Sequence, residues 1–474
     1  MRILFCSPEA VPYAKTGGLA DVSSALPAEL RNQGIDCIVA IPLYRPVKQS
    51  GIELNEVCEI SFLSGQGISR GRVFSHGETY FIENDPYFGR QGYYSYHGRD
   101  FPDNLERFAF FSRACVELAL TLGDIDLIHC NDWQTALVPA YIHALGVPGI
   151  ATCYTIHNLA YQGVFDPDLW PLLFLPSEYF HPEIMEYHGC INIMKAGIVF
   201  SDAITTVSPT YAREIQTPEF GVGLEGLLRS VSARLTGIVN GIDTREWNPQ
   251  SDPHIACRYD ARDLSGKAAC KRDLKQRLSL DPGTGPLFAL IGRLVDQKGI
   301  DLVVAVMDEL MDLGAQAAIL GSGDSRHEQA LRDLCARYPG RLGVFIGFDE
   351  SLAHVIEAGA DFFLMPSRFE PCGLNQMISM RYGTIPVVTR VGGLRDTVEV
   401  LGESDKPTGL GVAAPTVQAL LEAVREAVHL YTGREEILDQ MRRNAMARDV
   451  SWRSSALQYY NLYIETTKFR ERAR

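Results

Sequence analysis

Residues 15–22 read Lys-Thr-Gly-Gly-Leu-Ala-Asp-Val, and they follow an apolar run at residues 3–6. Two adjacent glycines let a ligand approach the backbone closely, because no Cβ stands in the way. The helix that opens at these residues points unpaired N–H groups at the same gap, and Lys15 adds a positive charge. The stretch therefore predicts a strand–loop–helix joint that binds a phosphorylated ligand.

Two other interpretations of the glycine pair are open. A pair of glycines after a strand is often only a tight turn. A dinucleotide fingerprint is the second alternative, but the G-x-G-x-x-G pattern is absent. A similar joint, Arg-Val-Gly-Gly-Leu-Arg-Asp-Thr at residues 390–397, follows an apolar run at 385–389. This repetition favours the phosphate interpretation and indicates two similar domains that face one cleft.

Composition limits the fold and the partners. The chain has 474 residues, 46% of them apolar, which fits two α/β domains better than one core. The net charge of −14 argues against nucleic acid or an anionic membrane as the main partner. An anionic ligand would be repelled by this overall field, so local Lys and Arg side chains must reverse the sign at its site.

The cysteines indicate a reducing compartment. The chain has 11 cysteines and no C-x-x-C pattern, so neither a zinc site nor a disulfide framework is predicted. Cys6, Cys37, Cys130 and Cys153 lie in or beside predicted strands, as buried thiols do. With no signal-peptide pattern and no apolar run near about 18 residues, we expect a soluble cytoplasmic protein.

Strand-like runs alternate with helical patterns along the chain, which predicts α/β structure with two Rossmann-like domains facing a deep cleft. Residues 55–83 alternate instead, as inserted hairpins do. We expect an N-terminal domain at 1–245, a C-terminal domain at 246–451, and a final helix at 452–474 that packs back on the first. Strands are predicted at 2–6, 35–41, 126–130, 150–156, 203–207, 235–239, 287–291, 316–320, 343–347, 361–365 and 385–389.

Two basic residues open the second domain. Arg293 and Lys298 lie in the loop that follows the strand at 287–291, so both can face one point at the carboxyl edge of the sheet. The planar fork of Arg and the point charge of Lys both suit a diphosphate. The alternative is that both are solvated loop charges.

Glu370 lies in the segment that follows the strand at 361–365, and a helix is predicted to start at about Gly373. The backbone N–H groups of Cys372, Gly373 and Leu374 suit sugar hydroxyls or a phosphate oxygen. Glu370 is then a nucleophile, a base or a hydroxyl anchor. Its alternative role is that of an acid stabilised by the helix dipole.

Polar residues also end strands of the first domain. His157 follows the strand at 150–156, Asp132 and Trp133 follow the one at 126–130, and Asn240 follows the last one. We expect these strand ends to converge on one crevice. A core histidine satisfied by the backbone is the alternative for His157.

A metal site is poorly supported. Asp124 and Asp126 have the D-x-D spacing of metal-dependent sugar transferases, but they precede a strand and should lie at the wrong edge of the sheet. Lys15, Arg293 and Lys298 can offset a diphosphate without a metal.

Five motifs occur in order: KTGGLADV, YTIHN, NGID, GRLxxQKG and EPCGL. Over essentially its whole length the chain resembles the bacterial glycogen synthases and plant starch synthases. The resemblance implies the GT-B glycosyltransferase architecture and transfer of glucose from ADP-glucose to the non-reducing end of an α-1,4-glucan. It also implies retention of configuration, with neither metal nor cofactor.

The resemblance assigns roles at matching positions. Arg293 and Lys298 bind and stabilise the departing diphosphate, with Lys15 adding charge. His157 and Asn240 contact the transferred glucose, Glu370 holds sugar hydroxyls, and Phe348 lies against the adenine. The other donor-binding positions are Gly17, Gly18, Asp21, Cys372, Gly373, Leu374 and Asn375, and the acceptor-binding ones are Asp132 and Trp133.

Two positions depart from the family pattern. Asn375 stands where Thr is common, so a hydroxyl contact to phosphate becomes an amide contact. Ile378 stands where a larger group of related transferases has a second Glu, which favours the synthases over that group.

Other functions remain open. The same fold can use UDP-glucose or make another oligosaccharide. An epimerase or phosphorylase is a different class, but neither an acid–base pair for the former nor a cofactor-lysine motif for the latter is found. A non-catalytic sugar-nucleotide sensor is a third class, disfavoured by the intact set of charged residues. The sequence leaves the oligomeric state and allosteric control open.

Overall fold

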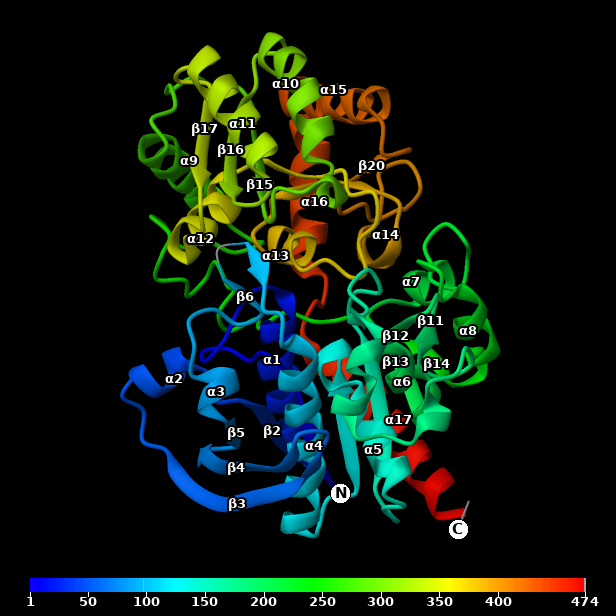
Figure 1. Ribbon diagram of the computed structural model, residues 1–474. Coiled ribbons are helices and arrows are strands. Elements are labelled where there is room, and N and C mark those ends of the chain that lie inside the picture. Colours follow the sequence, from blue (N-terminus) through cyan, green and yellow to red (C-terminus); the bar gives the residue numbers. More distant parts are fainter. Residues whose placement is uncertain (97, 473–474) are drawn as a thin grey trace. The chain divides into compact units, whose positions relative to one another are not determined.

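The computed structural model describes residues 1–96 and 98–472. These residues form two compact units, one made of residues 1–96, 98–240 and 452–472 and the other of residues 241–451. Figure 1 shows a sheet with flanking helices in each unit. Among the described residues, no helix is long and apolar enough to cross a membrane.

Unit 1 is built on a nine-stranded sheet in the order β14-β13-β9-β8-β1-β2-β5-β4-β3. Its strands from β14 to β5 pair in parallel, while β3, β4 and β5 form antiparallel hairpins at one edge, as the alternating pattern predicted. The strands are β1 Arg2–Cys6, β2 Asp36–Pro42, β3 Asn55–Ser64, β4 Gly67–His76, β5 Thr79–Glu83, β8 Leu127–Asn131, β9 Ala151–Ile156, β13 Ala203–Thr206 and β14 Leu235–Gly237.

Helices cover the sheet of unit 1, and short strands in its loops form a two-stranded and a three-stranded sheet. The helices are α1 Gly18–Asn32, α2 Arg45–Gln49, α3 Asp85–Phe88, α4 Asn104–Leu122, α5 Leu137–Ala144, α6 Ile193–Phe200, α7 Pro209–Glu214, α8 Glu225–Ser230 and α17 Trp452–Arg472. The short strands are β6 Ser95–Tyr96, β7 Arg99–Asp100, β10 Val164–Phe165, β11 Glu186–Tyr187 and β12 Cys190–Asn192.

Unit 2 is a six-stranded parallel sheet in the order β17-β16-β15-β18-β19-β20. Its strands are β15 Leu287–Ile291, β16 Gln316–Gly321, β17 Leu342–Ile346, β18 Phe362–Met365, β19 Ile385–Thr389 and β20 Leu410–Val412. Its helices are α9 Ser265–Arg277, α10 Ile300–Asp312, α11 Ser325–Arg337, α12 Glu350–Gly359, α13 Asn375–Arg381, α14 Gly392–Thr397, α15 Val417–Gly433 and α16 Glu435–Ala447.

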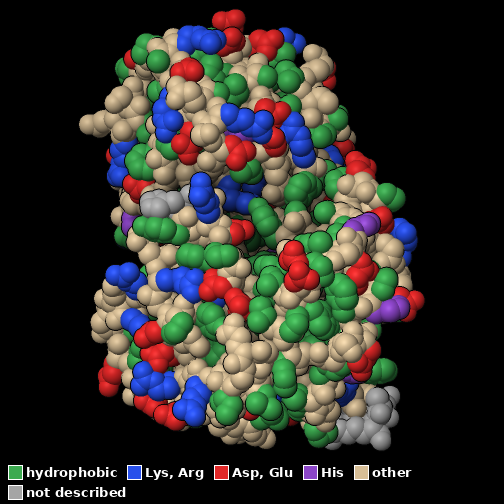
Figure 2. Space-filling model, in the orientation of Figure 1, with side chains coloured by type: hydrophobic (Ala, Val, Ile, Leu, Met, Phe, Trp, Pro, Cys, Tyr) green, Lys and Arg blue, Asp and Glu red, His purple; other side chains and the backbone are tan. Residues whose placement is uncertain are grey.

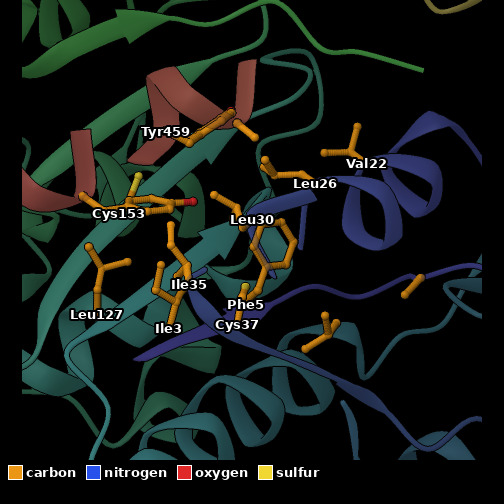
Figure 3. Close-up of a cluster of buried hydrophobic side chains, with 14 of the residues drawn as sticks. Ile3, Phe5, Val22, Leu26, Leu30, Ile35, Cys37, Leu127, Cys153 and Tyr459 are labelled. Carbon is orange, nitrogen blue, oxygen red and sulfur yellow. The ribbon is translucent and has the colours of Figure 1, made fainter. Parts of the chain in front are cut away.

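The core of unit 1 joins the first helix to the last. Val22, Leu26 and Leu30 of α1 face the central strands, and Tyr459 of α17 joins the same buried cluster (Figure 3). The spacing of three and four residues puts these apolar side chains on one face of α1. Each of the eleven cysteines is a free thiol, and the four predicted in or beside strands are buried.

Candidate active site

In unit 1 the strand order reverses beside β1. From β1 the chain continues on one side to β2, whereas β8 and the strands after it lie on the other side. Open α/β sheets bind ligands at the carboxyl ends of the strands at such a switch point. The loops that leave this edge are residues 7–17, after β1, and residues 132–136, after β8. The switch point thus brings the Lys15–Gly18 loop to the same edge as the predicted residues Asp132 and Trp133.

The first glycine of the Lys15–Gly18 loop is not required by the surrounding protein. Gly17 caps α1 with extended φ and ψ angles of −163° and −166°. No atom of the described chain lies within 4 Å of a Cβ built on it. Beside it, Lys15 Nζ forms an ion pair of 2.8 Å with Asp21 Oδ1, and both side chains are 31% exposed. The loop therefore keeps open space beside a positive charge.

Asp132 is a strained acid at the end of β8. Its φ of 56° and ψ of −179° fall in a region that glycine alone adopts readily. Its Oδ1 accepts the backbone N–H of His157 at 2.8 Å. Burial raises the pKa of this carboxyl to about 7, against the opposing effect of the backbone donors. Strain combined with a pKa near neutrality is typical of functional positions.

His157 is a neutral imidazole. Burial lowers its pKa to about 3. The amide nitrogen of Asn131 donates to Cys6 O at 3.0 Å, so Asn131 Oδ1 is the acceptor that faces His157 Nε2 at 2.9 Å. We therefore assign the ring proton to Nε2, which leaves Nδ1 as an acceptor.

Two other predicted residues of unit 1 are held in place. Asn240 is 6% exposed, and its buried Oδ1 has no hydrogen-bond partner among the described residues. A buried acceptor left in this way is satisfied when a ligand hydroxyl donates to it.

Trp133 packs between Phe108 and Phe165 at ring distances of 5.1 and 5.6 Å. Gly163 lets this ring approach, since an added Cβ would lie 2.6 Å from it.

In unit 2 the order reverses between β15 and β18, which pair directly. The loop after β15 carries Arg293 and Lys298, and the loop after β18 carries Ser367 and Glu370. A small cavity of about 20 Å³ is lined in part by Arg293, Lys298, Ser367 and Asn375. The switch point thus brings the predicted basic and acidic residues of this unit together.

The lysine and the acid form an ion pair. Lys298 Nζ lies 2.5 Å from Glu370 Oε2, which also accepts the Ser367 hydroxyl at 3.1 Å. Glu370 is 4% exposed. Arg293 is more exposed, and its Nη2 donates to Gln297 Oε1 at 3.4 Å. In unit 2, Lys298 is therefore held against a buried carboxylate, while Arg293 is an exposed cation that lines the same small cavity.

The second glycine pair differs from the first. A Cβ on Gly392 would lie 1.9 Å from Glu370 O, and one on Gly393 would lie 2.2 Å from Cys372 O. These glycines let the start of α14 pack directly on the loop that carries Glu370. The two joints share the strand–GGL–helix pattern, but in unit 2 the glycines serve close packing of backbone on backbone.

The helix after Glu370 begins at Asn375, two positions later than the sequence predicted. Cys372 is buried, Gly373 has a φ of +73°, and Leu374 is the N-cap. Positive φ at Gly373 turns the chain before the helix can start, which delays it. Asn375 Nδ2 donates to Ile291 O at 2.7 Å, so part of this amide already ties α13 to β15.

The remaining candidates lie apart from these clusters. Phe348, predicted against the adenine, follows β17 and is 75% exposed. Asp124 and Asp126 both bind Arg2, through its guanidinium at 2.5 Å and its backbone N–H at 2.7 Å. In the described part of the chain, no group of three or more His, Cys, Asp or Glu residues could hold a metal ion.

A larger cavity lies elsewhere in unit 1. Its volume is about 580 Å³, it lies between β3, α4, α5 and residues 171–176, and it contains none of the predicted site residues. Its walls are mostly apolar, and hydrophobic side chains also gather on the face of unit 1 drawn in Figure 2. Size alone does not identify the site, because the residues of the predicted motifs lie at the carboxyl ends of the parallel strands and not in this cavity.

Known proteins resemble the chain over nearly its whole length. Residues 2–230 match the starch synthase catalytic domain, and residues 271–448 match the glycosyl transferases group 1. The glycogen synthase of Anaeromyxobacter sp. (strain Fw109-5) is 48% identical over 98% of this chain and 99% of its own length. That of Myxococcus xanthus (strain DK1622) is 47% identical at the same coverage.

A solved structure has the same architecture. The catalytic domain of starch synthase IV from Arabidopsis thaliana, bound to ADP and acarbose, matches with a TM-score of 0.90 and 32% identity. The match covers 98% of this chain and 99% of that one. The α/β glycosyltransferase fold with two Rossmann-like domains, expected from the sequence, is confirmed.

Proposed function

The chain belongs to the glycogen synthase family of glycosyltransferases, and we propose that it moves glucose from ADP-glucose to the non-reducing end of an α-1,4-glucan with retention of configuration. The observation that carries the proposal is the placement of charged residues at the switch point of each sheet, with Lys298 paired to Glu370 in unit 2. The relative of known structure was solved with ADP, which supports an adenine nucleotide as donor.

The proposed chemistry follows from charge. The bond between the sugar and the phosphate breaks as negative charge grows on the diphosphate, so fixed cations at that point lower the barrier. We assign this work to Arg293 and Lys298, with Lys15 adding charge. Gly17, Gly18, Asp21, Asn240, Phe348, Cys372, Gly373, Leu374 and Asn375 bind the donor, and His157 contacts the transferred glucose.

Retention is proposed to follow from attack on the same face that the diphosphate leaves. Glu370 holds sugar hydroxyls in this scheme, because the Ser367 hydroxyl donates to its Oε2 at 3.1 Å and the carboxylate is left to accept sugar hydroxyls once Lys298 turns to the diphosphate. The departing phosphate takes the proton of the acceptor hydroxyl. A glucosyl ester trapped on Glu370 would contradict this scheme.

Asp132 and Trp133 are proposed to meet the acceptor glucan. We assign the acceptor side to the N-terminal domain, residues 1–245 with the helix at 452–474, and the donor side to residues 246–451, with Lys15, Gly17, Gly18, Asp21 and Asn240 as the donor-binding residues of the N-terminal domain. Water must be kept from the donor, and closure of the two domains about residues 240–250 would exclude it.

The proposal also covers the metal and cofactor requirement, the cellular location and the partners of the enzyme. Three cations take the role that a metal has in other sugar transferases, so we propose a metal-independent, cofactor-free reaction. A cytoplasmic location is inferred from eleven free thiols. ADP-glucose and glycogen are the proposed partners, with no nucleic acid and no membrane among them.

The experiment is transfer of radiolabelled glucose to glycogen, with ADP-glucose and UDP-glucose compared side by side. We expect incorporation from ADP-glucose to exceed that from UDP-glucose. Equal or greater incorporation from UDP-glucose would overturn the donor assignment and leave the alternative of a UDP-glucose enzyme. Chelator is added in a parallel reaction, where we expect the rate to be unchanged.

A further inference from the structure

A buried carboxylate lies directly beside the Lys15–Gly18 loop. Glu9 follows β1, and it is 3% exposed. Its Oε2 accepts the Thr16 backbone N–H at 2.5 Å, and its Oε1 accepts the Thr16 hydroxyl at 2.6 Å. The backbone N–H of Gly17 also donates to this carboxylate. One side chain therefore fixes two consecutive residues of the loop.

The same carboxylate reaches a second loop. The hydroxyl of Tyr94 donates to Glu9 Oε1 at 2.5 Å. Tyr94 lies between α3 and α4, and its carbonyl accepts Phe101 N–H at 3.0 Å and Asn104 Nδ2 at 2.9 Å. Glu9 thus ties the glycine loop to a segment that α4 holds in place.

The charge of Glu9 calls for an explanation. Burial raises the pKa of this group, while its hydrogen bonds oppose that effect. An anion here also repels any phosphate that approaches the loop. A carboxylate does one thing that an amide cannot, since it has acceptor sites alone and satisfies all four donors that converge on it. The geometry therefore indicates that fixing the loop outweighs the repulsion.

We propose that Glu9 is a positioning residue of the donor site, whose carboxylate holds the Thr16–Gly17 backbone so that the amide of Gly18 and Lys15 Nζ face the diphosphate. The proposal rests on the proposed function, which assigns this loop to the donor. At the N-terminus of α1 the amide of Gly18 has no acceptor within the helix, so it is available to a phosphate oxygen once the preceding turn is fixed.

Glu9 also acts electrostatically on Asp132. Its charge is one of the causes that raise the pKa of Asp132, after burial. The other titratable groups that it perturbs are Tyr44, Tyr93 and Tyr94, with Arg107 acting on Tyr44. Burial raises the pKa of each of these tyrosines, so within this described set Asp132 is the group that titrates near neutral pH. Removing the Glu9 charge therefore lowers the pKa of Asp132.

The test is Glu9→Gln, which keeps the size of the side chain but replaces one acceptor oxygen by an NH2 donor, so that the side chain no longer accepts from all four donors. We expect KM for ADP-glucose to rise at least tenfold while KM for glycogen changes less than twofold. The acid limb of the pH–rate profile should shift to lower pH. Thr16→Val removes one hydrogen bond and keeps the charge, so it should raise KM for ADP-glucose by less and leave the limb in place.

The outcomes separate the role of Glu9 from the proposed function. A folded Glu9→Gln enzyme with both KM values and the acid limb of the wild type overturns the role of Glu9. If Glu9→Gln fails to fold, Thr16→Val and Tyr94→Phe decide, and unchanged KM for ADP-glucose in both overturns it. If the wild type transfers glucose from neither nucleotide, the proposed function fails, and calorimetric binding of ADP to the wild type and Glu9→Gln then tests Glu9 alone.

Discussion

Lys298 Nζ lies 2.5 Å from Glu370 Oε2, at the switch point of the sheet in unit 2. The carboxylate is buried, and the lysine is 24% exposed at its side chain. A buried carboxylate that keeps a cation beside it holds that cation at a defined point. In the proposed reaction a diphosphate at this point would compete with Glu370 for the lysine, and the ion pair would hold the ammonium group in place before the ligand binds.

Replacing either cation of unit 2 should slow the chemical step. We expect Lys298→Ala and Arg293→Ala to lower kcat by about 10²–10³, the scale for removing one group that stabilises transition-state charge. The measurement is the rate of glucose transfer at saturating ADP-glucose. Arg337→Ala is the matched control, since Arg337 is 57% exposed and pairs with Asp308 on the surface. Near wild-type rates in both site variants would refute the assigned roles.

Replacing Gly17 by Ala and replacing Gly393 by Ala should have different effects, the first on substrate binding and the second on stability. Gly17→Ala meets open space in the described chain, so we expect an unchanged Tm and a rise in KM for ADP-glucose of about 10–100-fold, as for a lost contact to a charged group. Gly393→Ala would place its Cβ 2.2 Å from Cys372 O and should lower Tm. Normal KM in Gly17→Ala would contradict a ligand at this loop.

Asp132 predicts how activity depends on pH. Its pKa is about 7, so below that pH the group is a neutral acid, which accepts a sugar hydroxyl more weakly than the carboxylate does. Transfer should therefore fall as pH drops through about 7, and Asp132→Asn should be about 10–100-fold slower without this limb. His157 cannot cause the limb, because its pKa is about 3. A limb retained in Asp132→Asn would contradict the assignment.

The protonation of Asp132 should also make stability depend on pH, but in the direction opposite to activity. The folded protein binds the Asp132 proton more tightly than the unfolded chain, whose carboxyl has a pKa of about 3.9. Its contribution to stability is therefore largest at low pH and is lost as pH rises through about 7. We expect Asp132→Asn to gain Tm over the wild type as pH rises from about 5 to about 8. An equal Tm difference at both pH values would count against it.

The last helix should matter to the stability of unit 1. Tyr463 is 0% exposed, and its hydroxyl lies 2.7 Å from His129 Nδ1. We expect Tyr463→Ala to cost about 3–5 kcal/mol, as other large-to-small core changes do. Tyr463→Phe removes the hydrogen bond alone and should cost about 1 kcal/mol. Urea unfolding measures both, and equal losses would mean that packing of the ring contributes little.

Much of the fold could be predicted because parallel strands are continuous apolar runs. The strands at 287–291 and 385–389 have the predicted bounds. Strand β20, Leu410–Val412, was missed because three residues with a central glycine carry no periodicity. The start of α13 was placed too early because a backbone turn at Gly373 cannot be read from a sequence.

The site was predicted less completely than the fold. Basic residues after strands are visible as motifs, and Arg293 and Lys298 do line one small cavity. The strain at Asp132 is a property of its backbone conformation, which cannot be predicted from the residue type. Glu9, which we propose as a positioning residue, was not among the predicted residues, although an acid between the end of a strand and a Lys-Thr-Gly-Gly loop is a usable signal. The different packing of the two glycine pairs depends on tertiary contacts.

The crystal structure of this chain with ADP bound tests the central claim most directly. The account predicts that Lys298 Nζ leaves Glu370 for the diphosphate, and that Arg293 and Lys15 come within hydrogen-bond distance of its oxygens. If Lys298 stays on Glu370 while the diphosphate binds elsewhere, the claim that these cations stabilise the leaving group is contradicted.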